Sequence, residues 1–452
     1  MSYDRSRDSY RNWLSLTGSA LATVGAILFL AFFFLDLAGF QGNPYFGIVS
    51  YLFLPALFVL GLLLIPFGLW RARRRAAAGR PMHEWPVIDL SQRHVRHAVV
   101  GVVALTCVNA AIIATATTES VEYVDSREFC TGVCHTPMEP EGVAHQRSVH
   151  ASITCATCHV GPGAEGFVRA KLGGVRRLAA VVSGSYLRPI PAPVHDLPAA
   201  VGTCRGCHTP TKYVGDVVRR FPYYSDDEAV TEQVTTMTVR VGGGGWEAGG
   251  PGGIHWHASP QTRVEYIATG RNRETIPFVR VSDSKGVREY AVEGTTAEEL
   301  AAGEQRVMDC TDCHNRAGHD IAATPDRAVD RALAQGVLPR TLPFVRREAI
   351  AALSAEYSDR VTADQGIAQR ITTFYSQQSN LTSDPRVTET IRAAQALHAG
   401  NVFPRMNVKW GTYPSNLGHT DVTGCFRCHD DLHKTKAGAA ISQDCELCHR
   451  ME

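Results

Sequence analysis

The chain has 452 residues, of which 44% are hydrophobic and 20% charged, and its formal net charge is +1. A chain of this length exceeds one ordinary globular core and predicts more than one domain. Its near-neutral charge gives no sign of nucleic-acid binding, and its hydrophobic residues are concentrated near the N-terminus.

Three apolar stretches without a charged residue lie at residues 14–35, 45–70 and 98–116. Each has about the 20 residues that a helix needs to cross a bilayer. Buried core helices are rarely this long and uniformly apolar. The first stretch also exceeds the apolar region of a usual cleaved signal peptide, and no obvious small-residue cleavage site follows it. Residues 1–117 are therefore predicted to form a membrane domain with three transmembrane helices.

Arginines flank these stretches unevenly. Three precede the first stretch and seven lie between the second and third, whereas the connection at residues 36–44 has none. Because positive charge stays on the cytoplasmic side, the N-terminus is predicted to be cytoplasmic. The chain after residue 116 then lies outside the cytoplasmic (inner) membrane, in the periplasm or its equivalent. That exterior part has 35 basic and 39 acidic residues, a mild excess of negative charge.

Twelve of the 13 cysteines occur in pairs, two or three residues lying between the partners, and a histidine follows each pair directly. The motifs are Cys130-Thr-Gly-Val-Cys134-His135, Cys155-Ala-Thr-Cys158-His159, Cys204-Arg-Gly-Cys207-His208, Cys310-Thr-Asp-Cys313-His314, Cys425-Phe-Arg-Cys428-His429 and Cys445-Glu-Leu-Cys448-His449. Two thiols at this spacing can add to the vinyl groups of one porphyrin while the histidine ligates its iron. The motifs predict six covalently bound haem c groups, with the motif histidines as proximal iron ligands.

Zinc and structural disulfides are the rival explanations of paired cysteines. A structural zinc ion needs four ligands and usually joins two pairs, and it does not require a histidine directly after every pair. Disulfides in an exported domain leave the six histidines unexplained as well. The remaining cysteine, Cys107, lies in the third apolar stretch and is interpreted as a packing residue.

Second axial ligands are available outside the motifs. Nine further histidines lie in the exterior part: His145, His150, His195, His255, His257, His319, His398, His419 and His433. A second imidazole closes the iron and suits it to electron transfer. His398 shares a predicted helix face with apolar residues, and a histidine in such a position is more often a core residue than an iron ligand. Met138, three residues after His135, is a candidate ligand of the first haem.

The exterior part divides into three segments. Residues 118–215 and 308–452 each hold three haem motifs, and residues 216–307 hold none. Strand-like runs at residues 263–267, 276–281 and 287–292 predict a small β-containing insertion there. Helices are predicted to begin at Thr324-Pro325 and at Asp384-Pro385, with Gly400 closing the second. The fold class is predicted to be mainly α, with much irregular haem-wrapping chain.

The sequence resembles the NapC/NirT/NrfH family of membrane-anchored multihaem c-type cytochromes. The resemblance covers roughly residues 98–210 and 308–320: the third apolar stretch, a haem motif with a nearby methionine, Ser148-x-His150 before the second motif, Lys171, and the fourth motif continuing as Asn-Arg-Ala-Gly-His319. The rest resembles an enlarged three-span branch of inner-membrane cytochromes of extracellular electron transfer. His255-Trp-His257 and the run from residue 411 to His433 carry that likeness.

This resemblance implies oxidation of a quinol, such as menaquinol, at the membrane surface beside the first haem, in the manner of anaerobic respiration. In the family a methionine, a lysine and an acidic residue six or seven positions later form the quinol site. Met138 and Lys171 match the first two. Arg177 and Leu178 occupy the acidic positions, so Glu165 or Asp196 would have to substitute. The implied partners are the membrane quinone pool, periplasmic multihaem or other soluble cytochromes, and other membrane subunits.

Two other functions remain open at the sequence level. One is a haem-relay or anchor subunit of a larger respiratory complex, for which the first two apolar stretches would supply a docking surface. The other is a terminal reductase of an oxyanion such as nitrite, which requires one iron with an open position. The absence of a Cys-x-x-Cys-Lys motif and the surplus of histidines argue against it.

Overall fold

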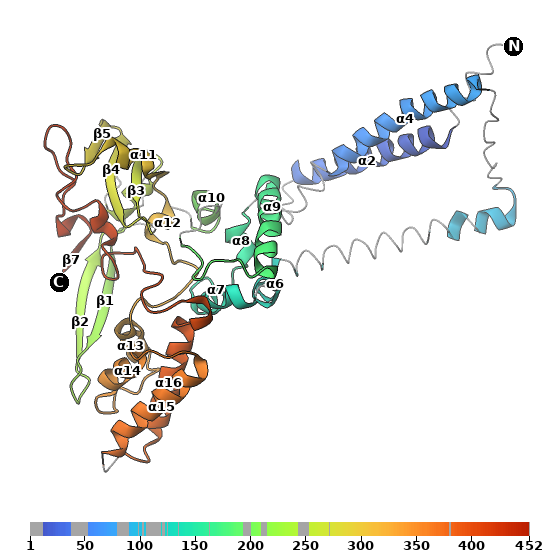
Figure 1. Cartoon of the computed structure of the whole chain (residues 1–452). Helices are drawn as coiled ribbons and strands as arrows, with labels where there is room; N and C mark the ends of the chain where they lie inside the picture. The colour runs from blue at the N-terminus through green and yellow to red at the C-terminus, as the bar shows by residue number, and fades with distance from the viewer. Residues whose placement is uncertain are drawn as a thin grey trace. The chain divides into compact units, whose positions relative to one another are not determined.

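The computed structural model describes residues 12–37, 53–78, 90–97, 99–101, 104, 119, 123, 125–133, 135–161, 163–192, 200–208, 215–242, 253–270, 272–378 and 381–451. The chain divides into two compact units. Unit one is Met1–Val124 with Val160–Val175, and unit two is Asp125–His159 with Arg176–Glu452. Figure 1 labels the elements of both.

Unit one contains two long helices that lie side by side (Figure 1), α2 (Trp13–Leu37) and α4 (Leu54–Ala77). Helix α2 covers the first predicted apolar stretch. Helix α4 begins nine residues into the second stretch and extends past it into an arginine-rich last turn. By length and composition, Leu54–Arg75 could cross a membrane, and α2 carries a shorter apolar run, Trp13–Phe29. Most of the third predicted stretch lies outside the described residues.

Small residues let α2 and α4 approach each other closely. A Cβ atom added to Gly61 would lie 2.5 Å from the backbone nitrogen of Ala22, and one added to Gly18 would lie 2.7 Å from the carbonyl oxygen of Gly61. The Ser15 hydroxyl donates a hydrogen bond of 3.0 Å to the Ile65 carbonyl. Backbone contact at small residues, with a polar hydrogen bond between the helices, is typical of helix pairs that pack in lipid.

Unit two holds the haem motifs on short helical turns joined by irregular chain. The helices of this region are α6 (Arg127–Val133), α7 (His135–Arg147), α8 (Cys155–His159), α10 (Ala200–Cys204) and α12 (Cys310–Cys313), with 3-10 turns η6 (Gly424–Arg427) and η7 (Cys445–Leu447). Helix α9 (Gly163–Val182) has residues in both units. Among the described residues, helix thus predominates around the motifs, in agreement with the predicted mainly α fold.

Two small antiparallel sheets lie in unit two. The first has the order β1-β2-β7, and the second β5-β4-β3-β6. The strands are β1 (Val217–Tyr224), β2 (Glu232–Val239), β3 (Arg263–Thr269), β4 (Thr275–Asp283), β5 (Gly286–Ala291), β6 (Glu304–Val307) and β7 (His449–Met451), and α11 (Ala297–Ala302) precedes β6. The three strands predicted in the insertion are confirmed as β3, β4 and β5. Pairing of β7 with β2 ties the last haem motif to the start of the insertion.

The four-stranded sheet positions the histidine pair of the insertion. Alternate β3 residues Val264, Tyr266 and Ala268 are buried against β4 residues, which makes a small core. The 3-10 turn η4 (Ile254–Ala258), which carries His255 and His257, comes just before β3. Its preceding residue, Gly253, has φ = 88°, and a Cβ atom there would run into the backbone of residues 240 and 242. Only glycine therefore suits the entry to this turn.

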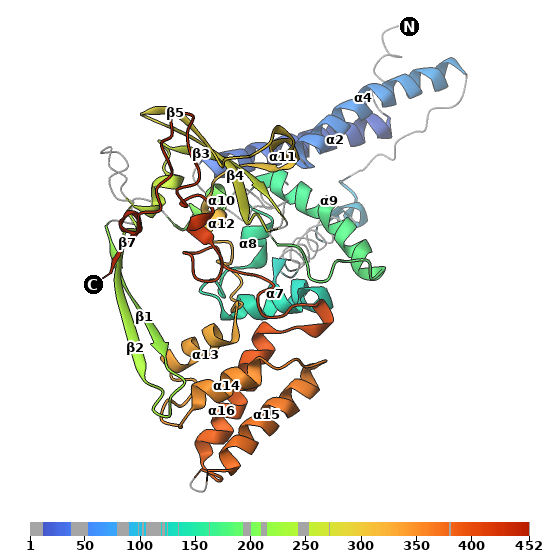
Figure 2. The same cartoon turned by 60° about the vertical axis from the view of Figure 1, so that its left-hand side comes forward.

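The largest core belongs to four helices inserted between the fourth and fifth motifs: α13 (Pro325–Ala334), α14 (Val345–Leu353), α15 (Arg360–Ser376) and α16 (Pro385–Asn401). Figure 2 shows them gathered into one bundle. Both predicted helix starts are confirmed, because α13 follows Thr324 and the Asp384 side chain caps α16. The prediction that Gly400 closes α16 is wrong: the helix continues to Asn401, and Gly400 instead gives room to the Arg147 guanidinium.

Replacing Gly61 by leucine should separate α2 from α4, since overpacking of this kind costs about 1–3 kcal/mol. We expect a lower midpoint of thermal unfolding in detergent, measured by circular dichroism at helical wavelengths. Leu63→Ala, at a position of α4 that is 62% exposed, is the matched control and should change the midpoint little. Equal midpoints for Gly61→Leu and the parent protein would contradict the packing described.

Candidate haem centres

Each described haem motif forms a single helical turn. In three of them the backbone N–H of the histidine donates a hydrogen bond to the backbone carbonyl of the first cysteine. The distances are 2.8 Å for His208, 2.9 Å for His314 and 3.1 Å for His429. This hydrogen bond closes one turn and brings the first cysteine and the histidine onto one side of the backbone. The chain is thus locally shaped to present thiols and imidazole to a single group.

Five motif histidines each face a histidine from outside the motifs. The ring centres are 6.0 Å apart for His159 and His319, 5.9 Å for His208 and His150, 6.4 Å for His314 and His255, 5.9 Å for His429 and His257, and 6.3 Å for His449 and His419. His150 precedes the second motif, His319 follows the fourth, and His419 precedes the fifth. The other two, His255 and His257, belong to η4. All five partners are among the nine histidines proposed from the sequence.

These separations match two imidazoles that share one metal ion. With metal–nitrogen bonds of about 2.0–2.1 Å and roughly 1.2 Å from nitrogen to ring centre, the two ring centres should lie about 6.3 Å apart. Ordinary aromatic pairs have a similar spacing of 4.5–7 Å. Chance packing, however, would not pair a motif histidine with a non-motif histidine in all five cases. The residues present therefore fit a haem at each of these motifs.

Backbone carbonyls contact the Nδ1 atom of several of these histidines at hydrogen-bond distance. Nδ1 of His150 lies 2.9 Å from the Ala317 carbonyl, and Nδ1 of His257 lies 2.8 Å from the Ile254 carbonyl. Nδ1 of His429 contacts the Ser442 carbonyl at 2.8 Å. A bond at Nδ1 sets the tautomer and leaves Nε2 for a metal.

Burial keeps several of these imidazoles neutral, as a metal ligand must be. Desolvation is the largest cause that lowers the pKa of His159, His255, His257 and His314. For His159, the charge of His319 lowers the pKa further, whereas Glu141 opposes the shift.

The thiols show that consecutive motifs are neighbours. A hydrogen bond from the Cys130 thiol is the main cause that lowers the pKa of Cys155 to about 6, and a bond from Cys204 similarly lowers the pKa of Cys310 to about 7. The pKa values of three further thiols, Cys158, Cys313 and Cys448, are raised. Burial is the largest cause, and the charges of neighbouring sulfurs add to it. The pairs involved are Cys158 with Cys207, Cys313 with Cys425, and Cys448 with Cys425. The six motifs therefore follow one another in sequence order through unit two.

The first motif is described least. Cys134 lies outside the described residues, and His135 begins α7 without a described side chain. Met138 is half-buried on the same helix. Further along α7, His145 is buried, its Nδ1 has no hydrogen-bond partner, and its ring centre lies 6.2 Å from that of His319.

The residues proposed for a quinol site have little described geometry. Lys171 and Glu165 belong to α9, but their side chains are outside the description, as are all of Asp196 and His195. The two residues at the expected acidic positions, Arg177 and Leu178, are exposed on α9.

His433 and His398 have different surroundings from the five facing histidines. The His433 ring is 1% exposed; its Nδ1 contacts Asp430 at 2.9 Å and its Nε2 contacts the Ile276 carbonyl. Both of its nitrogens are therefore engaged by protein oxygens. His398 is buried on α16, edge-on to Tyr357 at 5.4 Å, and its Nδ1 has no partner.

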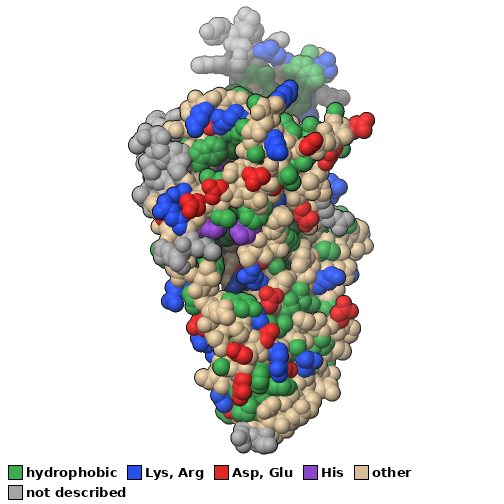
Figure 3. Space-filling model, turned by 90° about the vertical axis from the view of Figure 1, so that its left-hand side faces the viewer, with side chains coloured by type: hydrophobic (Ala, Val, Ile, Leu, Met, Phe, Trp, Pro, Cys, Tyr) green, Lys and Arg blue, Asp and Glu red, His purple; other side chains and the backbone are tan. Residues whose placement is uncertain are grey.

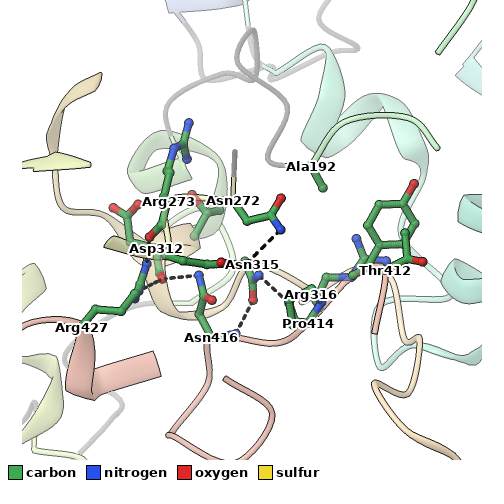
Figure 4. A pocket seen from close by; sticks show the side chains of 13 residues that line it. Ala192, Asn272, Arg273, Asp312, Asn315, Arg316, Thr412, Pro414, Asn416 and Arg427 are labelled. Carbon is green, nitrogen blue, oxygen red and sulfur yellow. Dashed lines mark hydrogen bonds between the residues drawn. The ribbon is translucent and has the colours of Figure 1, made fainter. Parts of the chain in front are cut away.

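A small polar pocket lies next to the fourth motif and includes Thr311 and Asp312 of that motif in its lining. Figure 4 shows Arg273, Arg316 and Arg427 among its lining side chains. The Arg316 guanidinium lies 4.8 Å above the Tyr413 ring and 3.7 Å from Glu141, and its Nε and Nη2 atoms have no hydrogen-bond acceptor. Burial lowers the pKa of Arg316, and the charge of Glu141 opposes that shift.

Glu141 was not singled out by the sequence, because an acidic residue on a helix is normally solvated. Its side chain is only 16% exposed, and its carboxylate lies 2.8 Å from Nδ1 of His319. Burial alone would raise the pKa of this carboxyl, but the His319 hydrogen bond and the charges of His319 and Arg316 outweigh burial and lower it.

The chain is similar along almost its whole length to a known cytochrome. It is 36% identical over 448 residues to the cytochrome c-type protein ImcH of Geobacter sulfurreducens, in an alignment that covers 97% of this chain and 88% of that protein. The chain belongs to the NapC/NirT/NrfH-like family of multihaem c-type cytochromes. It is a membrane-anchored multihaem c-type cytochrome of electron transfer, which implies covalently bound haem c.

A shorter region is similar to a second family member. The cytochrome c nitrite reductase subunit NrfH of Nitratidesulfovibrio vulgaris is 33% identical over 115 residues, which are 25% of this chain and 65% of NrfH. No family model matches the chain. No solved structure matches it either.

Removing one facing imidazole should open one iron. In His257→Ala we expect one haem to become high-spin, measured by magnetic circular dichroism and low-temperature electron paramagnetic resonance (EPR). His433→Ala is the control: it should leave every haem low-spin and lower stability by about 1–3 kcal/mol through the lost buried hydrogen bonds. A high-spin signal in His433→Ala but not in His257→Ala would reverse the assignment.

Proposed function

We propose that this protein is a membrane-bound six-haem cytochrome that oxidises quinol and delivers the electrons to acceptors outside the cytoplasm. The main support is the opposition of a second imidazole to each of five motif histidines, at 5.9–6.4 Å between ring centres. Each haem c, when bound, carries one electron, and two imidazoles leave its iron no open position for a substrate. Such centres suit electron transfer better than reduction of an oxyanion.

In this proposal the five facing histidines are the distal ligands. His319, His150, His255, His257 and His419 serve the second to sixth motifs in that order. His433 is then a structural residue, because both of its ring nitrogens are hydrogen-bonded. The first haem, with three residues between its cysteines, takes His135, with Met138 or His145 as the candidate partners on α7.

Quinol oxidation is proposed beside the first motif. A quinol loses two protons and two electrons, so the site needs a proton acceptor as well as an electron acceptor. Lys171 can hydrogen-bond a quinone oxygen as a point cation. Glu165 and Asp196 are the candidate proton acceptors, since Arg177 and Leu178 stand where the family has an acid.

The composition of α9 supports a site at the membrane surface. Leu172, Val175 and Val182 are 71%, 70% and 82% exposed, and Arg169, Arg176 and Arg177 lie on the same helix. Exposed apolar side chains beside arginines are typical of helices that lie in the headgroup layer of a bilayer. Lys171, in the middle of this helix, would then meet quinol where it reaches the surface.

The proposed membrane arrangement has three spans, a cytoplasmic N-terminus and an extracytoplasmic unit two. It is supported by the arginine distribution and by the close packing of α2 on α4. Electrons would leave near the sixth motif. Basic and acidic side chains are interspersed over the face drawn in Figure 3. The mild negative excess of the exterior part would suit docking against a basic patch on soluble cytochromes, including multihaem ones.

A haem-relay or anchor subunit is the second candidate. It is favoured by the likeness to NrfH, which is named as a subunit of a nitrite reductase. In that case the electrons would come from another membrane subunit, and the helix pair α2–α4 would be its docking surface. The two candidates differ in whether the isolated protein accepts electrons from quinol.

Rapid anaerobic mixing separates these candidates. The oxidised protein in detergent is mixed with a menaquinol analogue, and the absorbance of reduced haem is followed. We expect fast reduction, slowed roughly 10- to 100-fold in Lys171→Ala, because a charged hydrogen bond contributes about 1.5–3 kcal/mol. Lys285→Ala, on the exposed β4–β5 turn, should behave as the parent. Prompt reduction by a small low-potential donor but none by quinol would support the relay subunit instead.

The number of haems has its own test. Intact mass spectrometry of the denatured protein should give the mass of the chain plus six haems, because covalent attachment survives denaturation. Cys445→Ser with Cys448→Ser should give five. A parent mass with fewer than six haems would contradict the proposal.

A further inference from the structure

Glu141 gives one of the facing histidines an anionic partner. Its carboxylate lies 2.8 Å from Nδ1 of His319, and its own backbone carbonyl lies 3.2 Å from the same nitrogen. The ring centre of His319 lies 6.0 Å from that of His159 of the second motif. Glu141 therefore contacts the histidine that faces His159 at the second haem site.

Two other facing histidines have neutral partners at the equivalent atom. Nδ1 of His150 contacts the carbonyl of Ala317, and Nδ1 of His257 contacts the carbonyl of Ile254. The proximal His429 likewise contacts a carbonyl, that of Ser442. A carboxylate and a carbonyl both fix the tautomer, but the carboxylate adds a full negative charge. The second site thus differs electrically from the third and fifth.

A carboxylate bonded to a ligand histidine makes the imidazole more basic. The more basic ligand favours the oxidised, more positively charged iron, which lowers the reduction potential. The environment strengthens this effect, since the Glu141 side chain is 16% exposed and the charge of a buried group is weakly screened. Arg316, 3.7 Å away and 11% exposed, opposes it with a nearby positive charge.

We propose that Glu141 is a positioning residue that, through His319, lowers the reduction potential of the haem attached at Cys155 and Cys158. The inference rests on the proposed function, because it takes His319 and His159 as the two ligands of one iron. It adds that the second attachment site, next to the proposed quinol end, is set apart from the sites with carbonyl partners. Arg316 limits the size of the effect.

The test compares Glu141→Gln with Glu139→Gln, an exposed position two residues earlier on α7. The parent and both variants are titrated spectroelectrochemically with chemical mediators, and their low-temperature EPR spectra are recorded. In Glu141→Gln we expect one haem to shift to a higher midpoint potential with altered g values, while the others keep theirs. Glu139→Gln should match the parent. Unchanged potentials and g values in Glu141→Gln, with all haems attached, would overturn the proposal.

Arg316→Gln should shift the midpoint potential of the same haem in the opposite direction. Loss of this cation leaves the negative charge of Glu141 uncompensated. We therefore expect a lower midpoint potential in Arg316→Gln and a higher one in Glu141→Gln. An upward shift in both variants would indicate a general loosening of the fold and reject the proposal. The measurement uses no quinol. Failure of quinol to reduce the protein would therefore reject the proposed function alone, whereas an unresponsive Glu141→Gln rejects the role of Glu141 alone.

Discussion

The arrangement of unit two depends on the opposition of paired imidazoles from separate parts of the chain. Each pair requires a short turn with a motif histidine and a second segment held about 6 Å away. The sheet β5-β4-β3-β6 holds η4 against the fourth and fifth motifs. The loop after the fourth motif places His319 opposite His159 of the second motif. Elements without haem motifs thus have a clear role: they hold a second histidine about 6 Å from a motif histidine.

Buried polar bonds keep neighbouring motifs in register. The Asp312 carboxylate, inside the fourth motif, accepts hydrogen bonds from the Tyr266 hydroxyl of β3 and from Arg306 of β6. Arg427 of the fifth motif donates to the Asp312 carbonyl at 2.9 Å. Removing one member of such a buried network is costly, because it leaves the other members without partners. The geometry between the fourth and fifth attachment sites is therefore fixed by the chain as well as by any haem.

The sequence carried local information well and long-range information poorly. Strands β3, β4 and β5 and the starts of α13 and α16 were predictable, since alternation, capping residues and proline act over a few positions. The pairing of histidines was not, because His257 and His433 have the same chemistry in the sequence and differ only in what the fold brings to their nitrogens. Glu141 was missed for the same reason. Gly400 was misassigned because a glycine that makes room for Arg147 looks like a helix terminator.

The turn η4 carries two histidines only two residues apart, and they face different motifs, His255 the fourth and His257 the fifth. Gly253, with its positive φ, fixes how the chain enters this turn. One backbone segment thus positions the histidines that face two haem motifs at once. Local opening of this five-residue turn would release both histidines together, so the two sites would respond as a single cooperative unit.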